Sequence, residues 1–372
     1  MNPRRSVILA IFMGIALGVN GAEGPDKVEK RVEKIHRRYL IVDSHTDTPM
    51  NLVKPGFDIA VLHDSAGNAA LDFPKMKKGG VDAAFFAVFV SQGSRDEAGY
   101  DQALKRAMLL FDTIHAVIRE NSRIAGLALT PADAYRLKRQ GKRAIFIGME
   151  NGYPVGKDLD LVQTYFNLGA RYITLCHLKN NDICDSSTDT TGFGGLSDFG
   201  KNVVLYMNKL GMMVDVSHIS DRSFYDVLSV TKAPVIASHS CARALCNHPR
   251  NLDDDMLRAL AKNGGVIQVC LLGVYVKNPD GQPVTVRDVA DQIDHIVKVA
   301  GINHVGIGSD LDGGGGVKGC SDVGEMKNIT RELISRGYSD RDIGKIWGGN
   351  LMRVMHKVSA VSGKINKSCG CN

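Results

Sequence analysis

The sequence lacks the features that identify several classes of protein. No segment recurs at intervals of about 20 to 50 residues and no low-complexity linker interrupts the chain, which argues against a solenoid or a repeat array. Basic residues are scattered, so the net charge of +6 predicts no nucleic-acid-binding surface. The eight cysteines include no Cys-x-x-Cys pair and are too few for a disulfide framework in 372 residues. The composition, 44% hydrophobic and 23% charged, is typical of a globular protein.

Long hydrophobic runs are also missing, apart from a short one near the N-terminus. Arg4 and Arg5 precede the apolar stretch 7–19, and Asn20-Gly21-Ala22 offers small residues for cleavage, a pattern typical of a secretory signal peptide. An uncleaved anchor is the alternative, but the stretch is short for a bilayer span. No cysteine follows it and no apolar segment ends the sequence, so we expect no lipid anchor. We predict a signal peptide over 1–22, export to the periplasm or outside the cell, and no stable membrane anchor.

Strand-like and helix-like segments alternate along the rest of the chain. Eight near-continuous apolar runs indicate strands of a parallel sheet that is buried on both faces: 40–44, 81–90, 143–149, 171–176, 212–217, 234–238, 265–271 and 304–309. Amphipathic stretches lie between them, with capping signals such as Thr130, Gly211 and Gly264. We therefore predict an α/β fold, a (β/α)₈ TIM-type barrel over 23–358, followed by a polar tail over 359–372. An open doubly wound sheet is the alternative.

Side chains that commonly bind metals stand where six of these strands end. They are His45 and Asp47, Glu150, His177, His218, His239 and Asp310. In a barrel the carboxyl ends of all strands share one rim, and a rim of His, Asp and Glu predicts a metal site. An open sheet would gather ligands from only a few strands, so this distribution favours the closed barrel.

Each of these motifs is ambiguous when taken alone. His45 and Asp47 point to the same side of an extended segment and could bind one ion, and the two oxygens of Glu150 could bridge two ions. A capping or loop role would explain each of them equally well, so the prediction rests on five such residues occurring together. His177 is either a third nitrogen ligand or a substrate contact.

Two further residues near the predicted rim suit a substrate. Arg250, in the loop after the sixth strand, could bind a carboxylate bidentately, although pairing with Asp253 or Asp254 is the alternative. Asp310 could relay a proton or hold an ammonium group, and Asp312 competes with it for this role.

Together these segments resemble the membrane dipeptidase (renal dipeptidase) family of binuclear zinc peptidases over residues of about 35 to 358. The resemblance rests on Asp43-Ser44-His45-Thr46-Asp47, Gly148-Met149-Glu150-Asn151-Gly152, Leu175-Cys176-His177-Leu178-Lys179-Asn180, Gly195-Leu196-Ser197-Asp198-Phe199-Gly200, Val214-Asp215-Val216-Ser217-His218, Ser238-His239-Ser240, Pro249-Arg250-Asn251, Gly306-Ile307-Gly308-Ser309-Asp310-Leu311-Asp312-Gly313 and Gly348-Gly349-Asn350-Leu351-Met352-Arg353.

The resemblance implies two Zn²⁺ ions per chain, bridged by Glu150. His45 and Asp47 would complete one site, and His218 and His239 the other. Among the substrate-binding and catalytic positions, His177 would stabilise the oxyanion, Arg250 would hold the C-terminal carboxylate, and Asp310 would contact the amino group and move the proton.

The implied reaction is the hydrolysis of free dipeptides by a metal-bridging hydroxide. The resemblance also implies that the substrates include dipeptides with a D-residue at the second position and the lactam of some carbapenems. Two other functions remain open: a related metal hydrolase such as a deaminase or lactonase, which usually begins with His-x-His rather than His45-x-Asp47, or a repurposed binding or maturation protein. The expected partners are small dipeptides, with a homodimer as a candidate assembly and no nucleic acid.

Overall fold

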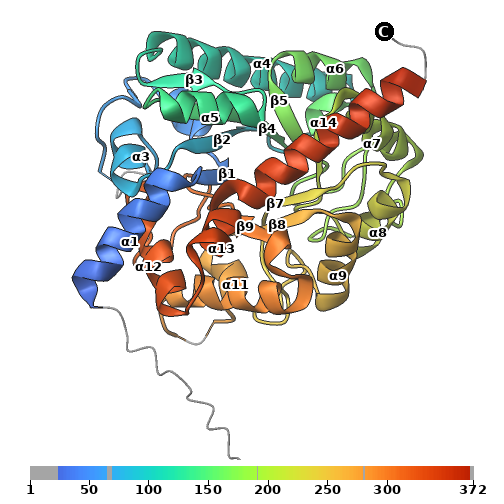
Figure 1. Cartoon of the computed structure of the whole chain (residues 1–372). Coiled ribbons are helices and arrows are strands. Elements are labelled where there is room, and N and C mark those ends of the chain that lie inside the picture. Colours follow the sequence, from blue (N-terminus) through green and yellow to red (C-terminus); the bar gives the residue numbers. More distant parts are fainter. Residues whose placement is uncertain (1–23, 65–68, 191, 280, 369–372) are drawn as a thin grey trace, which may run out of the picture.

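The structure is a computed structural model that describes residues 24–64, 69–190, 192–279 and 281–368. Eight parallel strands follow one another around the sheet in chain order, with helices interleaved between them (Figure 1). These strands are β1 (Val42–Thr46), β2 (Ala83–Phe89), β4 (Arg143–Glu150), β5 (Ala170–Thr174), β6 (Met213–Asp215), β7 (Ile236–Ser240), β8 (Val266–Val269) and β9 (Val305–Ile307).

The first and last of these strands approach each other, so the sheet is nearly closed. Thr46 forms a parallel bridge with Leu311, just beyond β9, and the Asp43 carboxylate accepts hydrogen bonds from the backbone N–H and the hydroxyl of Ser309. The predicted (β/α)₈ barrel is therefore confirmed over the open sheet. A further short strand that we did not predict, β3 (Ala125–Leu127), pairs with β4 off the barrel path.

The helices begin and end at ordinary capping residues. Thr130 and Asp133 form a capping box at α5, and Gly211 and Gly264 end α7 and α9 with φ values of 82° and 85°, which glycine adopts without a steric penalty. The helices are α1 (Pro25–Arg38), α2 (Pro49–Leu52), α3 (Phe73–Gly79), α4 (Glu97–Glu120), α5 (Pro131–Arg139), α6 (Asp160–Asn167), α7 (Asp198–Leu210), α8 (Asp221–Val230), α9 (Asp254–Asn263), α10 (Gly273–Val276), α11 (Val286–Ala300), α12 (Lys327–Ser335), α13 (Asp340–Gly344) and α14 (Asn350–Ser368), with short helical turns at Tyr153–Val155, Ile302–His304, Val323–Glu325 and Lys345–Gly349.

Successive side chains alternate between the barrel interior and the surrounding helices, as the pleat of a strand requires. Phe85 lies in the interior, where its ring centroid is 4.6 Å from that of Phe146 and 5.5 Å from that of Tyr172. The next residue, Phe86, belongs instead to the apolar layer shared with the helices. The interior is therefore filled by side chains, and the site must lie at an end of the barrel.

Helix α14 covers the amino-terminal end of the barrel. Leu351, Val354, Met355 and Val358 are buried in the same cluster as the inward side chains at the starts of the strands, and Figure 1 shows this helix crossing the molecule. The carboxyl ends of the strands, where the ligand-type residues stand, are thus left for the site.

The C-terminal boundary of the barrel domain differs from the prediction. Residues 359–368 form the last turns of α14 rather than a polar tail. Ser362 is buried, and its hydroxyl donates a 2.6 Å hydrogen bond to the carbonyl of Lys209 at the end of α7. Packing against α7 thus keeps this polar stretch helical.

Two predicted segments lie outside the described residues: the signal peptide over 1–22 and the end of the tail, Cys369-Gly370-Cys371. Among the helices that are described, none combines the length and the apolar character needed to cross a membrane.

Candidate metal centre

The barrel brings the predicted ligands to one rim. His45 lies in β1, Glu150 ends β4 and His239 lies in β7, whereas Asp47 and His218 follow β1 and β6. All five side chains are buried, with relative exposures between 0% and 4%. A buried cluster of imidazoles and carboxylates is costly unless its members pair or bind a cation, so these residues form a candidate metal centre.

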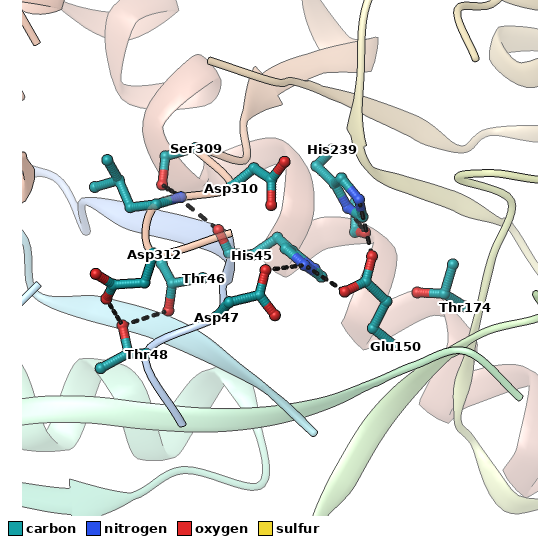
Figure 2. Close-up of polar contacts among 12 residues, drawn as sticks. His45, Thr46, Asp47, Thr48, Glu150, Thr174, His239, Ser309, Asp310 and Asp312 are labelled. Carbon is teal, nitrogen blue, oxygen red and sulfur yellow. Dashed lines mark hydrogen bonds and ion pairs between the residues drawn. The ribbon is translucent and has the colours of Figure 1, made fainter. Parts of the chain in front are cut away.

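Glu150 lies at the middle of this centre (Figure 2). Its Oε1 atom is 3.1 Å from Nε2 of His218 and 3.2 Å from Nε2 of His239. Its Oε2 atom faces the other way, 3.4 Å from Nε2 of His45, which is in turn 3.9 Å from Oδ2 of Asp47. Each carboxylate oxygen therefore meets a different set of ligand atoms, an arrangement consistent with a binuclear metal site.

The donor atoms suit a metal ion because several of them lack another partner. Over the described part of the chain, His45 Nε2 and Asp47 Oδ1 are buried without a hydrogen bond. Buried polar atoms are rarely left unsatisfied, and a divalent cation would satisfy both atoms. Imidazole nitrogen and carboxylate oxygen are also the ligand types that zinc accepts.

Hydrogen bonds on the far side of two rings direct their Nε2 atoms toward Glu150. The Tyr172 hydroxyl donates to the Ser44 carbonyl at 3.2 Å, so it can accept the Nδ1 proton of His45 at 2.8 Å. The Ser238 hydroxyl donates to Asp215 at 2.5 Å and can accept the Nδ1 proton of His239 at 2.8 Å. Each partner fixes the tautomer that leaves Nε2 free to bind a metal.

The pKa shifts also suit a cation at this place. Burial lowers the pKa values of His218 and His239 well below the usual range, which keeps both imidazoles neutral, as ligands must be. Burial opposes charge on His45, but the carboxylates of Glu150 and Asp47 outweigh it and raise the His45 pKa to about 10. The Glu150 pKa lies well below its usual range: burial would raise it, but His45 and the other histidines outweigh that effect. Positive charge is therefore favoured between these carboxylates.

Three loops at the rim adopt backbone conformations that are unusual for their residues. Asn151, His218 and Asp310 follow β4, β6 and β9 with φ values of 73°, 70° and 61°, in the left-handed region that side-chain-bearing residues rarely occupy. Such strained positions concentrate at functional sites. Here they turn the chain so that His218 and Asp310 join the cluster.

Asp310 and Asp312 differ in their contacts. Asp312 accepts hydrogen bonds from the Thr48 hydroxyl at 2.8 Å and from the Ala70 backbone at 2.6 Å, so it connects loops. Asp310 groups instead with His45 and Asp47, as Figure 2 shows. Burial raises its pKa to about 6, which suits a group that exchanges a proton near neutral pH.

Arg250 is a buried cation beside the cluster. Its side chain donates to the His239 carbonyl at 2.6 Å and to the Ser240 hydroxyl at 2.5 Å, and it is only 2% exposed. No carboxylate of the described residues forms an ion pair with it. The alternative partners are engaged elsewhere: Asp253 lies 3.9 Å from Arg243, and Asp254 lies 2.7 Å from His295. A buried, unpaired guanidinium is costly, and an anionic ligand would offset that cost.

His177 lies at the outer edge of the cluster. Its side chain is 21% exposed and its Nε2 atom is 3.8 Å from Glu150 Oε1, farther than either His218 or His239. Its ring contacts that of Phe89 edge-on at 4.9 Å. The position is more open than those of the other histidines, which favours a substrate contact over a third nitrogen ligand.

The sequence did not point to the residues that support the ligands. Tyr172 lies inside an apolar strand, where aromatic residues are common, and Asp215 lies two residues before the end of the predicted strand 212–217. The sequence held one signal, which is the glycine at position 148 inside an apolar strand. The structure gives its reason, because a Cβ added at Gly148 would lie 2.0 Å from the Tyr172 ring. A glycine inside an apolar strand indicates that another group packs closely against the backbone, but the glycine alone does not identify that group.

Comparison with known proteins agrees with this geometry. A sequence model of the membrane dipeptidase family, peptidase family M19, matches residues 29–369. The chain belongs to this family. It is therefore a dipeptidase, a hydrolase of peptide bonds.

Relatives in the membrane dipeptidase family match most of the chain. An uncharacterized dipeptidase of Schizosaccharomyces pombe is 34% identical and covers 93% of this chain and 86% of its own length. Dipeptidase ataJ of Aspergillus terreus is 33% identical and covers 89% of this chain and 88% of its own. The crystal structure of the probable dipeptidase PvdM from Pseudomonas aeruginosa superposes with a TM-score of 0.86 at 30% identity, over 91% of this chain and 100% of that one.

Proposed function

We propose that the protein hydrolyses free dipeptides with two zinc ions bridged by Glu150. The observation that carries this proposal is the division of the Glu150 oxygens between two sets of ligands. His45 and Asp47 would hold one ion, and His218 and His239 the other. When bound, such a metal pair polarises a carbonyl group and lowers the pKa of a water molecule enough to make it a nucleophile near neutral pH.

The residues around the pair would bind the two ends of a dipeptide. Arg250, buried and without a carboxylate partner among the described residues, would bind the free C-terminal carboxylate. Asp310 would bind the substrate amino group and transfer the proton to the leaving amine. His177, at the open edge, would donate a hydrogen bond to the oxygen that becomes negative during attack.

A requirement for both termini would restrict the substrate to a dipeptide. A longer peptide cleaved after its first residue has no free carboxylate one residue beyond the scissile bond, so Arg250 would remain unpaired. One cleaved before its last residue has no free amino group one residue before that bond, so Asp310 would remain unpaired. We include dipeptides with a D-residue at the second position in the proposed substrate class. We also propose that the mature protein is exported, on the basis of the signal-like segment 1–22.

A panel of dipeptides tests the proposal. The zinc-loaded protein should hydrolyse L-Ala-L-Ala and L-Ala-D-Ala, with release of free amino acids, and should leave Ala-Ala-Ala and acetylated Ala-Ala intact. Turnover of a lactone or an aminopurine without turnover of any dipeptide would support a related hydrolase. Binding of dipeptides without turnover would support a repurposed binding protein.

A further inference from the structure

A cavity of about 250 Å³ is lined by residues that adjoin the candidate metal centre. Met50 lines it, and the Met50 backbone donates to the carbonyl of Asp47 at 2.8 Å. Phe89 also lines it, pairs in register with Glu150 and contacts the His177 ring. The cavity therefore opens on the side of the centre formed by β1, β2 and β4, within reach of a substrate held there.

Helix α4 provides the opposite wall of this cavity and places a cation in it. Gly99, Gln102, Ala103 and Arg106 all line the cavity, at the three- and four-residue spacing that puts side chains on one helix face. Arg106 is half-buried, and none of the described residues forms an ion pair with it. Arg95, which precedes α4, is by contrast paired with Asp182 at 2.8 Å.

Among the described residues that line the cavity, no carboxylate offsets this charge. Asp96 is near in sequence, but its Oδ1 caps α4 by accepting from the Gly99 backbone at 2.8 Å and from the Ser94 hydroxyl at 3.0 Å. The walls made by Met50, Phe89 and Ala103 are apolar. The cavity thus combines these apolar surfaces and the uncharged polar residues Ser91, Ser94, Gln102 and Tyr153 with one guanidinium that has no ion-pair partner among the described residues, which suits a side chain with a methylene stem and an anionic end.

The position of the cavity indicates which residue of the substrate would enter it. Arg250 follows β7, so the C-terminal carboxylate of the proposed substrate would lie on the β7 side. The cavity lies across the centre, beside β1 and β2, where the N-terminal residue of a dipeptide bound in this way would place its side chain. We infer that this cavity binds an acidic side chain on the N-terminal residue of the dipeptide, with Arg106 as the residue that determines this specificity.

The inference rests on the proposed function, and a matched pair of substrates tests it. Glu-Ala and Gln-Ala have nearly the same shape and differ in charge. The zinc-loaded wild type should cleave Glu-Ala with a kcat/KM about tenfold higher, since a charge-assisted hydrogen bond in a half-buried site contributes about that factor. In Arg106→Gln the ratio should fall close to one, while Ala-Ala, which does not reach Arg106, should be cleaved as before.

A neighbouring lysine provides the control. Lys105→Gln removes the same charge from the same helix, but Lys105 is exposed and does not line the cavity, so the ratio should stay near ten. Equal rates for Glu-Ala and Gln-Ala in the wild type, or an unchanged ratio in Arg106→Gln, would reject this inference while leaving the dipeptidase proposal intact. Failure of the wild type to cleave any dipeptide, Ala-Ala included, would reject both.

Discussion

The hydroxyl of Tyr172 lies 2.8 Å from Nδ1 of His45, although the two residues belong to strands on different sides of the barrel. The contact crosses the interior because Gly148, on the strand between β2 and β5, leaves space for the phenol ring. Tyr172 is fully buried and its hydroxyl also donates to the Ser44 carbonyl. One residue of the candidate metal centre is thus oriented from the layer of side chains beneath it.

Tyr172→Phe should weaken metal binding without unfolding the protein. The ring packing would remain, but His45 would lose the partner that fixes its tautomer. Loss of such a partner typically lowers metal affinity by about 10- to 100-fold. Titration against a competing chelator measures the change. Tyr165→Phe removes another buried hydroxyl, which donates to Pro154 away from the centre, and should leave the affinity unchanged.

Metal analysis should give about two zinc ions per chain, the stoichiometry of a binuclear hydrolase. Glu150→Gln should hold at most about one, because the amide replaces one of the two bridging oxygens with a donor. His177→Gln should keep about two, since His177 is assigned to the substrate. A wild-type content of no more than one after zinc loading would remove the bridging role of Glu150.

Arg250→Ala should lower kcat/KM for free dipeptides by a factor of about ten to over a hundred, the equivalent of a contact of roughly 1.5–3 kcal/mol. The zinc content should not change, because Arg250 contacts His239 only through its carbonyl oxygen.

Dipeptide amides provide the control for this variant. They lack the carboxylate, so they should be poor substrates of the wild type and should lose little more in Arg250→Ala. An equal loss of kcat/KM for free dipeptides and for dipeptide amides would show that Arg250 has a structural role and that the carboxylate is recognised elsewhere.

The stability of the fold should depend on pH through His36. Its ring is buried, faces the Gly80 carbonyl at 3.2 Å and lies 2.8 Å from the Thr330 hydroxyl, and burial lowers its pKa to about 4. In the unfolded chain, His36 would bind a proton at about pH 6.5. The contribution of neutral, buried His36 to the free energy of unfolding is therefore complete above pH 6.5 and is lost as the pH falls toward 4.

The loss should amount to about 3 kcal/mol in the free energy of unfolding. His36→Gln should show a correspondingly smaller decrease between pH 6.5 and 4, measured by urea unfolding. His356→Gln, which removes an exposed histidine, is the matched control. Parallel pH profiles for the wild type and His36→Gln would contradict the assignment.

N-terminal sequencing of the protein from its native host should begin near Ala22 or Glu23. The reason is the pattern of Arg4, Arg5 and the apolar stretch 7–19. A cytoplasmic protein that begins at Met1 would contradict the proposed export.

The sequence located the residues of the candidate metal centre better than it located the residues that support them. His45, Glu150 and His239 could be found because apolar runs mark the strands and a parallel barrel brings the ends of its strands together. Tyr172 could not, since only the geometry across the barrel interior shows that its hydroxyl reaches His45. The end of α14 was placed too early for a related reason: residues 359–368 are polar, and their contact with α7 becomes visible only in three dimensions.

Helix α14 has a consequence for turnover. Because its apolar face fills the amino-terminal end of the barrel, a substrate would approach the candidate metal centre from the end of the barrel where the carboxyl ends of the strands lie. Each cycle of a dipeptidase with a single entrance releases two amino acids along the path by which the next dipeptide must arrive. If Arg250 binds the carboxylate as proposed, the product that remains on it would occupy the place of the incoming carboxylate, and its departure would have to precede the next round of hydrolysis.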